Sequence, residues 1–217
     1  VSFLPTQFAE QFVEMFENTK LRWLDTGGDK LRSFKKKNYA VVNNYGPTEY
    51  TVCTTNFVID KYYENIPIGK PVYNTTVYIL DKHNRLTPLS VPGELCISGA
   101  GIARGYLNRP ELTAGKFVEN PFVPGERMYR TGDLARWLSD GNIEFLGRID
   151  QQVKIRGFRI ELGEIEEALK KIDSVKDAVV IDRSDKQGNK YLCGYYISDI
   201  KLKSSELQKE LSQFLPD

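Results

Sequence analysis

Apolar positions in the first fifty residues follow two different periods. In PTQFAEQFVEMFENT, residues 5–19, they recur with helical spacing, and Thr6 is a candidate N-cap. Residues 21–29, LRWLDTGGD, and residues 39–42, YAVV, have the apolar character of short buried strands, and the first stretch ends in a glycine turn. This order predicts an α/β layer, in which ligands bind at the C-terminal ends of strands.

The pattern changes at about Pro67. From there to Gly147, short β-like runs such as TTVYILD, GELCISG and GNIEFLG alternate with Pro and Gly turns. These runs predict a small β-barrel or antiparallel sheet packed on the α/β layer. The turn DKHNRL contains the only histidine, His83, which we interpret as a solvated turn residue.

A second change comes near Asp150. Apolar and polar residues alternate on both sides of Gly157, as in a hairpin, and an apolar face from Leu162 to Ile172 then marks a helix. DAVVID and YLCGYYIS indicate strands, and SSELQKELSQFL a helix with a capping box from Ser205 to Gln208. We therefore expect a compact α+β module that moves as a unit.

Composition narrows the function classes. The chain has 217 residues, and its 30 Lys and Arg nearly cancel its 29 Asp and Glu, so no overall field favours nucleic acid or an anionic membrane. No apolar run approaches the roughly 18 residues needed to span a bilayer. Three scattered cysteines and one histidine do not supply a zinc site, and they favour a reduced, cytoplasmic setting. The N-terminus has no signal-peptide pattern and no Met, so we interpret the chain as a piece of a longer protein.

The loop NNYGPTEY comes after the second predicted strand. Pro47 fixes its own φ and restricts Gly46, so Thr48 and Glu49 are held at a defined point. A hydroxyl beside a carboxylate suits a phosphate oxygen and its magnesium ion. The tyrosine and the first asparagine of the loop offer a flat face and an amide to a base. On these residues alone, a strand-ending turn with an exposed acid remains the alternative.

Three further stretches contain candidate chemical groups. In YRTGDL, Asp133 offers a carboxylate that can accept bonds from both hydroxyls of a ribose, although an Asp in a turn is the alternative. In GRIDQQVKIRGFRIELGEIE, cations that include Arg148 and Lys154 lie beside a predicted hinge and could reach a polyphosphate, although a solvated face is the alternative. The glycine-rich residues 93–107 lack the ending of a P-loop, and a tight β-structure explains them.

Together and in this order, four motifs resemble the adenylation domains of nonribosomal peptide synthetases. They are N-x-Y-G-P-T-E, G-E-L-x-I-x-G-x-G-x-A-R-G-Y-L, Y-R-T-G-D-L and G-R-x-D-x-Q-V-K-I-R-G-x-R-I-E-L-G-E-I-E. These domains belong to the adenylate-forming superfamily, which includes acyl-CoA ligases and luciferases. The resemblance covers nearly the whole chain. It implies that residues 1–149 form the end of the large AMP-binding subdomain and residues 150–217 a truncated, mobile C-terminal subdomain.

The resemblance implies a role for each matching position. The implied nucleotide site consists of Asn43 and Tyr45 at the adenine, Gly46, Thr48 at the phosphate, Glu49 as magnesium ligand, Asp133 at the ribose hydroxyls, Phe145 as a lining residue, and Arg148 at the ribose or phosphate. The implied hinge is Asp150, and the implied loop that approaches the active site in the second half-reaction carries Lys154 and Gly157. The implied substrate pocket consists of Asp25, Gly27, Asn44, Val52 and Cys53.

The implied chemistry has two steps. An amino-acid carboxylate attacks the α-phosphorus of ATP, which gives an aminoacyl adenylate and pyrophosphate. A phosphopantetheine thiol on a carrier domain then takes the acyl group, and a condensation domain would be a further partner. Such catalysis rests on positioning and charge stabilisation. An acyl-CoA or D-alanine–carrier ligase, and a non-catalytic nucleotide-binding or interaction module, are the alternatives.

The resemblance also sets limits. The family's phosphate loop and the aspartate that pairs with the substrate amino group belong upstream of Val1, and its catalytic lysine belongs downstream of the last residue. We therefore expect the 217-residue chain by itself not to form the adenylate. Asp25 and Asn44 favour a polar or cationic substrate side chain, because a buried acid needs a partner. Alternatively, Asp25 caps the turn that comes after it.

Overall fold

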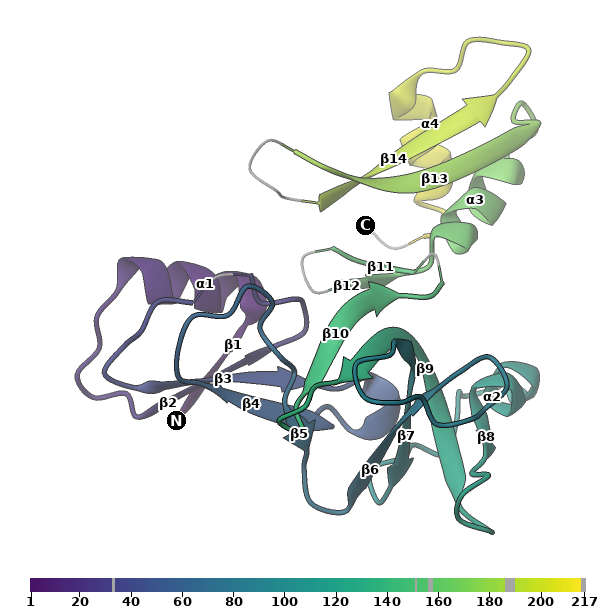
Figure 1. Ribbon diagram of the computed structural model, residues 1–217. Coiled ribbons are helices and arrows are strands. Elements are labelled where there is room, and N and C mark those ends of the chain that lie inside the picture. The colour runs from purple at the N-terminus through teal and green to yellow at the C-terminus, as the bar shows by residue number, and fades with distance from the viewer. Residues whose placement is uncertain (33, 151, 156–157, 186–189, 216–217) are drawn as a thin grey trace. The chain divides into compact units, whose positions relative to one another are not determined.

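The computed structural model describes residues 1–32, 34–150, 152–155, 158–185 and 190–215. The chain divides into two compact units, Val1–Asp150 and Gln151–Asp217 (Figure 1). The two units bury separate hydrophobic clusters. Within the described ranges, no helix is long and apolar enough to cross a membrane.

The first unit begins with a five-stranded sheet of order β1-β2-β3-β4-β5. Strands β1, β2 and β3 are parallel to one another, β4 is antiparallel to β3, and β5 is antiparallel to β4. The strands are β1 (Ser2–Pro5), β2 (Trp23–Gly27), β3 (Ala40–Tyr45), β4 (Thr55–Ile59) and β5 (Lys70–Pro71). Helix α1 (Thr6–Met15) connects β1 to β2 and buries Ala9 and Val13 against the sheet (Figure 1). The predicted helix and strands are confirmed, whereas β1 was not predicted.

The N-cap assigned to Thr6 is wrong. Pro5 precedes the helix, and the Thr6 hydroxyl donates to the Asp29 carbonyl at 3.1 Å and accepts from the Asp29 amide at 3.2 Å. The loop after β2 competes for the same hydroxyl, because a threonine can bond a distant backbone as readily as its own helix. The bond ties the start of α1 to the glycine turn.

A second, antiparallel sheet has the order β10-β9-β7-β6, with β8 paired to β9. Its strands are β6 (Thr75–Leu80), β7 (Gly93–Gly99), β8 (Phe117–Glu119), β9 (Arg127–Trp137) and β10 (Ile143–Arg148), and α2 (Pro110–Lys116) precedes β8. Tyr45, at the end of β3, is buried in the core of this sheet with Ile79, Leu95 and Ala135. The antiparallel sheet predicted for this part of the chain is therefore confirmed, and β3 leads directly into its core.

The second unit is a small α+β fold. Its elements are the antiparallel hairpin β11 (Val153–Ile155) and β12 (Phe158–Ile160), α3 (Leu162–Lys170), the antiparallel pair β13 (Asp177–Ser184) and β14 (Lys190–Ile197), and α4 (Ser204–Leu211). Helix α3 ends before Ile172, which is nevertheless buried. The capping box assigned to Ser205 and Gln208 is wrong, because the box lies two residues earlier: Lys203 is the N-cap, and its amide donates to the Glu206 carboxylate at 3.4 Å.

Two glycines with similar backbone angles test the packing of the first unit. Gly69 has φ +86, and a Cβ there would lie 1.7 Å from the Asn56 carbonyl oxygen, whereas Gly125 has φ +82 and open space. We expect Gly69→Ala to lower the free energy of unfolding by roughly 2–5 kcal/mol and Gly125→Ala by about 1 kcal/mol. Urea unfolding followed through Trp23 and Trp137 measures both values. Equal losses would contradict the packing at Gly69.

Candidate functional site

The loop after β3 is folded tightly back on itself. A Cβ on Gly46 would lie 2.1 Å from the Val52 carbonyl oxygen, so only glycine fits there. The Thr54 amide donates to the Tyr45 carbonyl at 2.8 Å and closes the loop. A short 3-10 helix, η1 (Thr48–Tyr50), lies inside this loop. The conformation of the loop is therefore fixed by the close approach of Gly46 to Val52 and by the bond between Thr54 and Tyr45.

The two residues predicted to bind phosphate and magnesium differ in exposure. Thr48 is exposed, whereas Glu49 is only 7% exposed. The Tyr106 hydroxyl donates to Glu49 Oε1 at 2.6 Å, and the Ala103 amide donates to the Glu49 carbonyl at 2.9 Å. The carboxylate is thus buried and held by a hydrogen bond, and it is not an exposed acid at the end of a strand.

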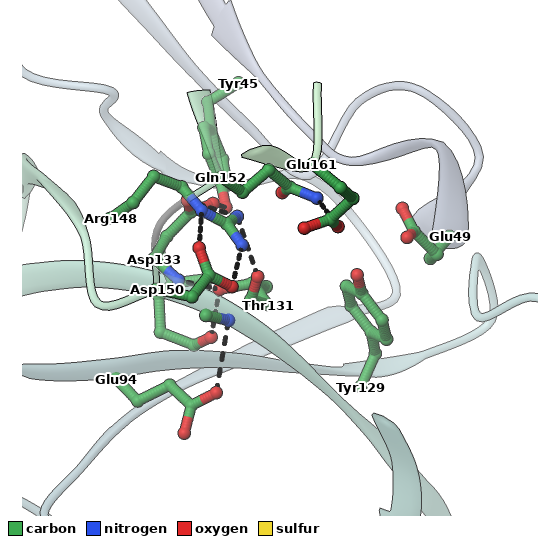
Figure 2. A network of polar contacts seen from close by, with 12 residues as sticks. Tyr45, Glu49, Glu94, Tyr129, Thr131, Asp133, Arg148, Asp150, Gln152 and Glu161 are labelled. Carbon is green, nitrogen blue, oxygen red and sulfur yellow. Dashed lines mark hydrogen bonds and ion pairs between the residues drawn. The ribbon is translucent and has the colours of Figure 1, made fainter. Parts of the chain in front are cut away.

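Asp133 forms the centre of a polar network in the second sheet (Figure 2). It is 4% exposed; Arg148 Nη1 donates to Oδ1 at 2.9 Å, and the Tyr45 hydroxyl donates to Oδ2. Burial and the Asp133 charge raise the pKa of Tyr45 well above its usual value, so the phenol remains a donor. A carboxylate has about four acceptor positions, and these contacts use two. The remaining acceptor capacity suits a pair of hydroxyl groups.

The Arg148 guanidinium joins Asp133 to the end of the first unit. It donates to Asp150 from Nε at 2.8 Å and from Nη2 at 2.5 Å, and to the Thr131 carbonyl at 2.9 Å (Figure 2). Gly132, at φ +72, leaves room for this pair, because a Cβ there would lie 2.7 Å from Asp150 Oδ2 and 2.8 Å from Arg148 Nη2. The predicted hinge residue is therefore ion-paired to the predicted ribose site.

The pairing between β7 and β9 shifts register next to Asp133. Leu95 of β7 is paired with Asp133, but the next residue, Cys96, is paired with Arg130, so Thr131 and Gly132 have no register partner on β7. Bulges of this kind are common beside active sites, where they re-aim side chains. The Thr131 hydroxyl accepts from the Asp133 amide at 2.9 Å and donates to the Leu95 carbonyl at 2.6 Å.

The predicted base-binding residues lie around the same network. The Phe145 ring lies 6.2 Å from the Tyr45 ring at an interplanar angle of 35°. The Asn43 side chain is buried, and its amide nitrogen donates to the Pro67 carbonyl at 2.9 Å. The structure thus brings Tyr45 and Phe145 together, while one donor of Asn43 is engaged by the backbone.

Three of the predicted substrate-pocket residues, Asp25, Asn44 and Cys53, are connected by hydrogen bonds. Asn44 Nδ2 donates to Asp25 Oδ1 at 3.1 Å, and the Cys53 thiol lies 3.8 Å from Asn44 Oδ1. Burial, and then the Asp25 charge, raise the pKa of the Cys53 thiol. A Cβ on Gly27 would lie 2.5 Å from the Asn44 carbonyl oxygen, and Val52 is 75% exposed. The Asp25 carboxylate thus has a hydrogen-bonded partner on the neighbouring strand.

Two predicted positions of the second unit are described only in part. Lys154 lies in β11, but its side chain is outside the described residues, as is Gly157.

Two residues that hold the site were not assigned a role from the sequence. Tyr106 lies in the glycine-rich stretch interpreted as tight β-structure, although the R-G-Y triplet was the available signal. Glu94 accepts from the Gly132 amide at 3.1 Å and from Arg130 Nε at 3.0 Å, so it supports the bulge (Figure 2). Nothing in the pattern of β7 distinguishes Glu94 from an ordinary polar strand residue.

The side chains described above can bind one magnesium ion only if the phosphates of a nucleotide and water complete its coordination shell. Among the described residues, no three His, Cys, Asp or Glu side chains gather as a metal cluster. Magnesium is commonly bound by one or two carboxylates plus waters and substrate phosphates. Glu49 can supply one such carboxylate, beside the exposed hydroxyl of Thr48.

Comparison with known proteins decides the family. The profile of the AMP-binding enzyme family matches residues 10–107. Bacitracin synthase 1 of Bacillus licheniformis is 58% identical over 217 residues, and gramicidin S synthase 2 of Brevibacillus brevis is 54% identical over 218 residues. The alignments cover 100% and 97% of this chain but only 4% and 5% of those proteins.

Solved structures agree. NpsA-ThdA, an artificially fused adenylation-PCP di-domain from Klebsiella oxytoca, has a TM-score of 0.80 at 26% identity, over 99% of this chain and 42% of that one. Holo-PA1221, a peptide synthetase protein containing adenylation and PCP domains, has a TM-score of 0.83 at 31% identity, over 96% and 39%. The chain belongs to the AMP-binding enzyme family. Within that family it is part of an adenylation domain of the nonribosomal peptide synthetase type.

The buried ion pair of this adenylation-domain segment can be tested by stability. We expect Arg148→Gln to lower the free energy of unfolding by about 2–4 kcal/mol, because it leaves the Asp133 charge buried without a cation. Arg130→Gln is the matched control on β9, since Arg130 is 36% exposed in its pair with Glu94 and should cost about 1 kcal/mol or less. Urea unfolding gives both values. Adding Asp133→Asn should recover part of the Arg148→Gln loss, and no recovery would argue against the pair.

Proposed function

We propose that this chain forms part of an ATP-dependent domain that activates an amino acid as its adenylate and passes it to a carrier-bound phosphopantetheine thiol. The observation that carries the proposal is the network in which the buried Tyr45 and Asp133 meet the half-buried Arg148, which combines an aromatic ring, a carboxylate with acceptor capacity left and a cation. In this proposal the ring matches the base and the carboxylate matches the ribose of a nucleotide, and Arg148 lies at the ribose or phosphate. The sequence similarity to antibiotic-forming synthetases supports this reading.

Each side chain has a defined task in this proposal. Tyr45 and Phe145 present the aromatic surface to the base, and Asp133 accepts the ribose hydroxyls while Arg148 orients its carboxylate. Thr48 offers its hydroxyl to the phosphates, and Glu49 holds the metal. A magnesium ion at Glu49 would offset negative charge on the phosphates as pyrophosphate departs. Positioning and charge stabilisation then suffice, without a protein nucleophile.

The partners belong to the same proposal. The two solved relatives described above combine adenylation and PCP domains in one protein, which supports a carrier domain as the acceptor. We further propose a condensation domain in the same assembly line, a cytoplasmic setting, and rotation of the second unit about Asp150. The loop of Lys154 and Gly157 would approach the active site in the thiol-transfer step.

Magnesium-dependent nucleotide binding tests the site directly. In the complete adenylation domain that contains this chain, Glu49→Gln should weaken ATP binding in the presence of magnesium by roughly tenfold or more, and should change binding in EDTA little. The exposed Glu64→Gln is the control and should behave as wild type. Calorimetric titration with and without the metal measures all three proteins. If wild-type binding is indifferent to magnesium, the assignment of Glu49 fails.

The Asp25–Asn44–Cys53 group indicates the substrate class. Because Asp25 is a partly buried carboxylate, we propose that the pocket prefers an amino acid with a hydrogen-bonding or cationic side chain. In amino-acid-dependent ATP–pyrophosphate exchange by the complete domain, a polar amino acid should exceed leucine, and Asp25→Ala should reduce that preference. Equal rates for leucine and every polar amino acid would reject this pocket assignment, and stimulation by fatty acids or D-alanine would favour the related ligases instead.

A further inference from the structure

The segment between β7 and α2 is attached to the loop of η1 at two points, Glu49 and Thr51. The Thr51 hydroxyl donates to the Gly101 carbonyl at 2.8 Å, and the Ala103 amide donates to the Glu49 carbonyl at 2.9 Å. Arg127 of β9 fixes the same segment, because its guanidinium donates to the Ala103 carbonyl at 2.9 Å and to the Arg104 carbonyl at 3.0 Å. These bonds hold residues 101–104 at a fixed distance from the predicted metal ligand.

This segment leads into Tyr106, whose side chain contacts Glu49. Its hydroxyl donates to Glu49 Oε1 at 2.6 Å and lies 3.5 Å from the Tyr129 hydroxyl. Hydrogen bonds to a charged acceptor are stronger than those between neutral groups, and a buried carboxylate needs such donors.

The surroundings of Tyr106 leave its ring little freedom. Its amide donates to the Thr113 hydroxyl at 2.9 Å, and its ring packs edge-on against Phe117 with centroids 5.5 Å apart. Gly105 has φ +141, and a Cβ there would lie 2.4 Å from Thr113 Cγ2. A glycine is therefore required immediately before the tyrosine. The R-G-Y triplet thus has a physical reason beyond tight β-structure.

We propose that Tyr106 is a positioning residue that orients the Glu49 carboxylate for magnesium. This inference rests on the proposed function of Glu49 as the metal ligand. Magnesium demands near-ideal octahedral geometry, so a carboxylate fixed before the metal arrives lowers the cost of binding. Partners that orient a metal ligand are worth 10–100-fold in metal affinity in known sites.

The test separates positioning from folding. In the complete adenylation domain, Tyr106→Phe keeps the ring and removes the hydroxyl, so the magnesium concentration at half-maximal ATP–pyrophosphate exchange should rise roughly tenfold. ATP binding in EDTA should remain unchanged, since no metal is involved. Tyr78→Phe is the matched control, because Tyr78 is half-buried in β6 and its hydroxyl accepts from Asn120 at 3.3 Å. It should leave the magnesium dependence as in wild type.

The outcomes are distinct. If wild type shows no magnesium-dependent nucleotide binding, the proposed function fails. If wild type shows it and Tyr106→Phe has the same magnesium half-saturation, the positioning role alone is wrong, and a lower melting temperature would mark Tyr106 as structural. If Tyr106→Phe does not fold, Thr113→Val is the deciding variant. It removes the Thr113 hydroxyl that accepts from the Tyr106 amide, and so loosens the Tyr106 backbone, but it keeps the Tyr106 hydroxyl. A raised magnesium half-saturation in that variant supports the proposal, and an unchanged one overturns it.

Discussion

The first unit depends on one largely enclosed guanidinium. Arg148 contacts the Asp133 carboxylate, the Thr131 carbonyl and the Asp150 carboxylate, while its own side chain is only 13% exposed. A cation shielded from water is tolerated when several acceptors surround it, and here they come from the neighbouring strand β9 and from the residue that ends the unit. Arg148 therefore links the centre of the candidate site to the boundary between the two units.

That arrangement is possible because β9 departs from regular pairing. A regular strand would place Thr131 and Gly132 each opposite a residue on β7, whereas the two extra residues change the register between Arg130 and Asp133. Gly132 also leaves the space that the ion pair occupies, since any side chain there would meet Arg148 and Asp150. The short Y-R-T-G-D-L motif thus contains both the bulge, at Thr131 and Gly132, and the acid that it positions, Asp133.

The sequence predicted the parts of this site better than their connections. The order of helix, strands and antiparallel sheet could be predicted because each has a local period, and the second unit likewise. The decisive bonds join distant residues: Tyr45 and Asp133 are 88 positions apart, and Glu49 and Tyr106 are 57 apart. Local patterns do not encode such pairs, which is why the Tyr106 contact was missed.

Competition between local and distant partners explains the other errors. Thr6 has the right side chain and position for an N-cap, but the loop after β2 takes its hydroxyl. In α4, an acid three residues after Lys203 bonds the helix start, ahead of the predicted box. Strand β1 has four residues and one parallel neighbour, which is too short to show a period. Tertiary contacts decided for Thr6 and β1, whereas in α4 one local pair of residues took the place of another.

The two buried carboxylates show how the site could separate a sugar from a metal. Asp133 and Glu49 each accept from a tyrosine hydroxyl, Tyr45 and Tyr106, whose pKa values are raised by burial. Asp133 is also paired with Arg148, and a carboxylate whose charge is already compensated attracts a further cation weakly. Its remaining acceptor capacity suits neutral hydroxyl groups. In the proposed function magnesium lies at Glu49, whose carboxylate accepts from the Tyr106 hydroxyl and is oriented by it.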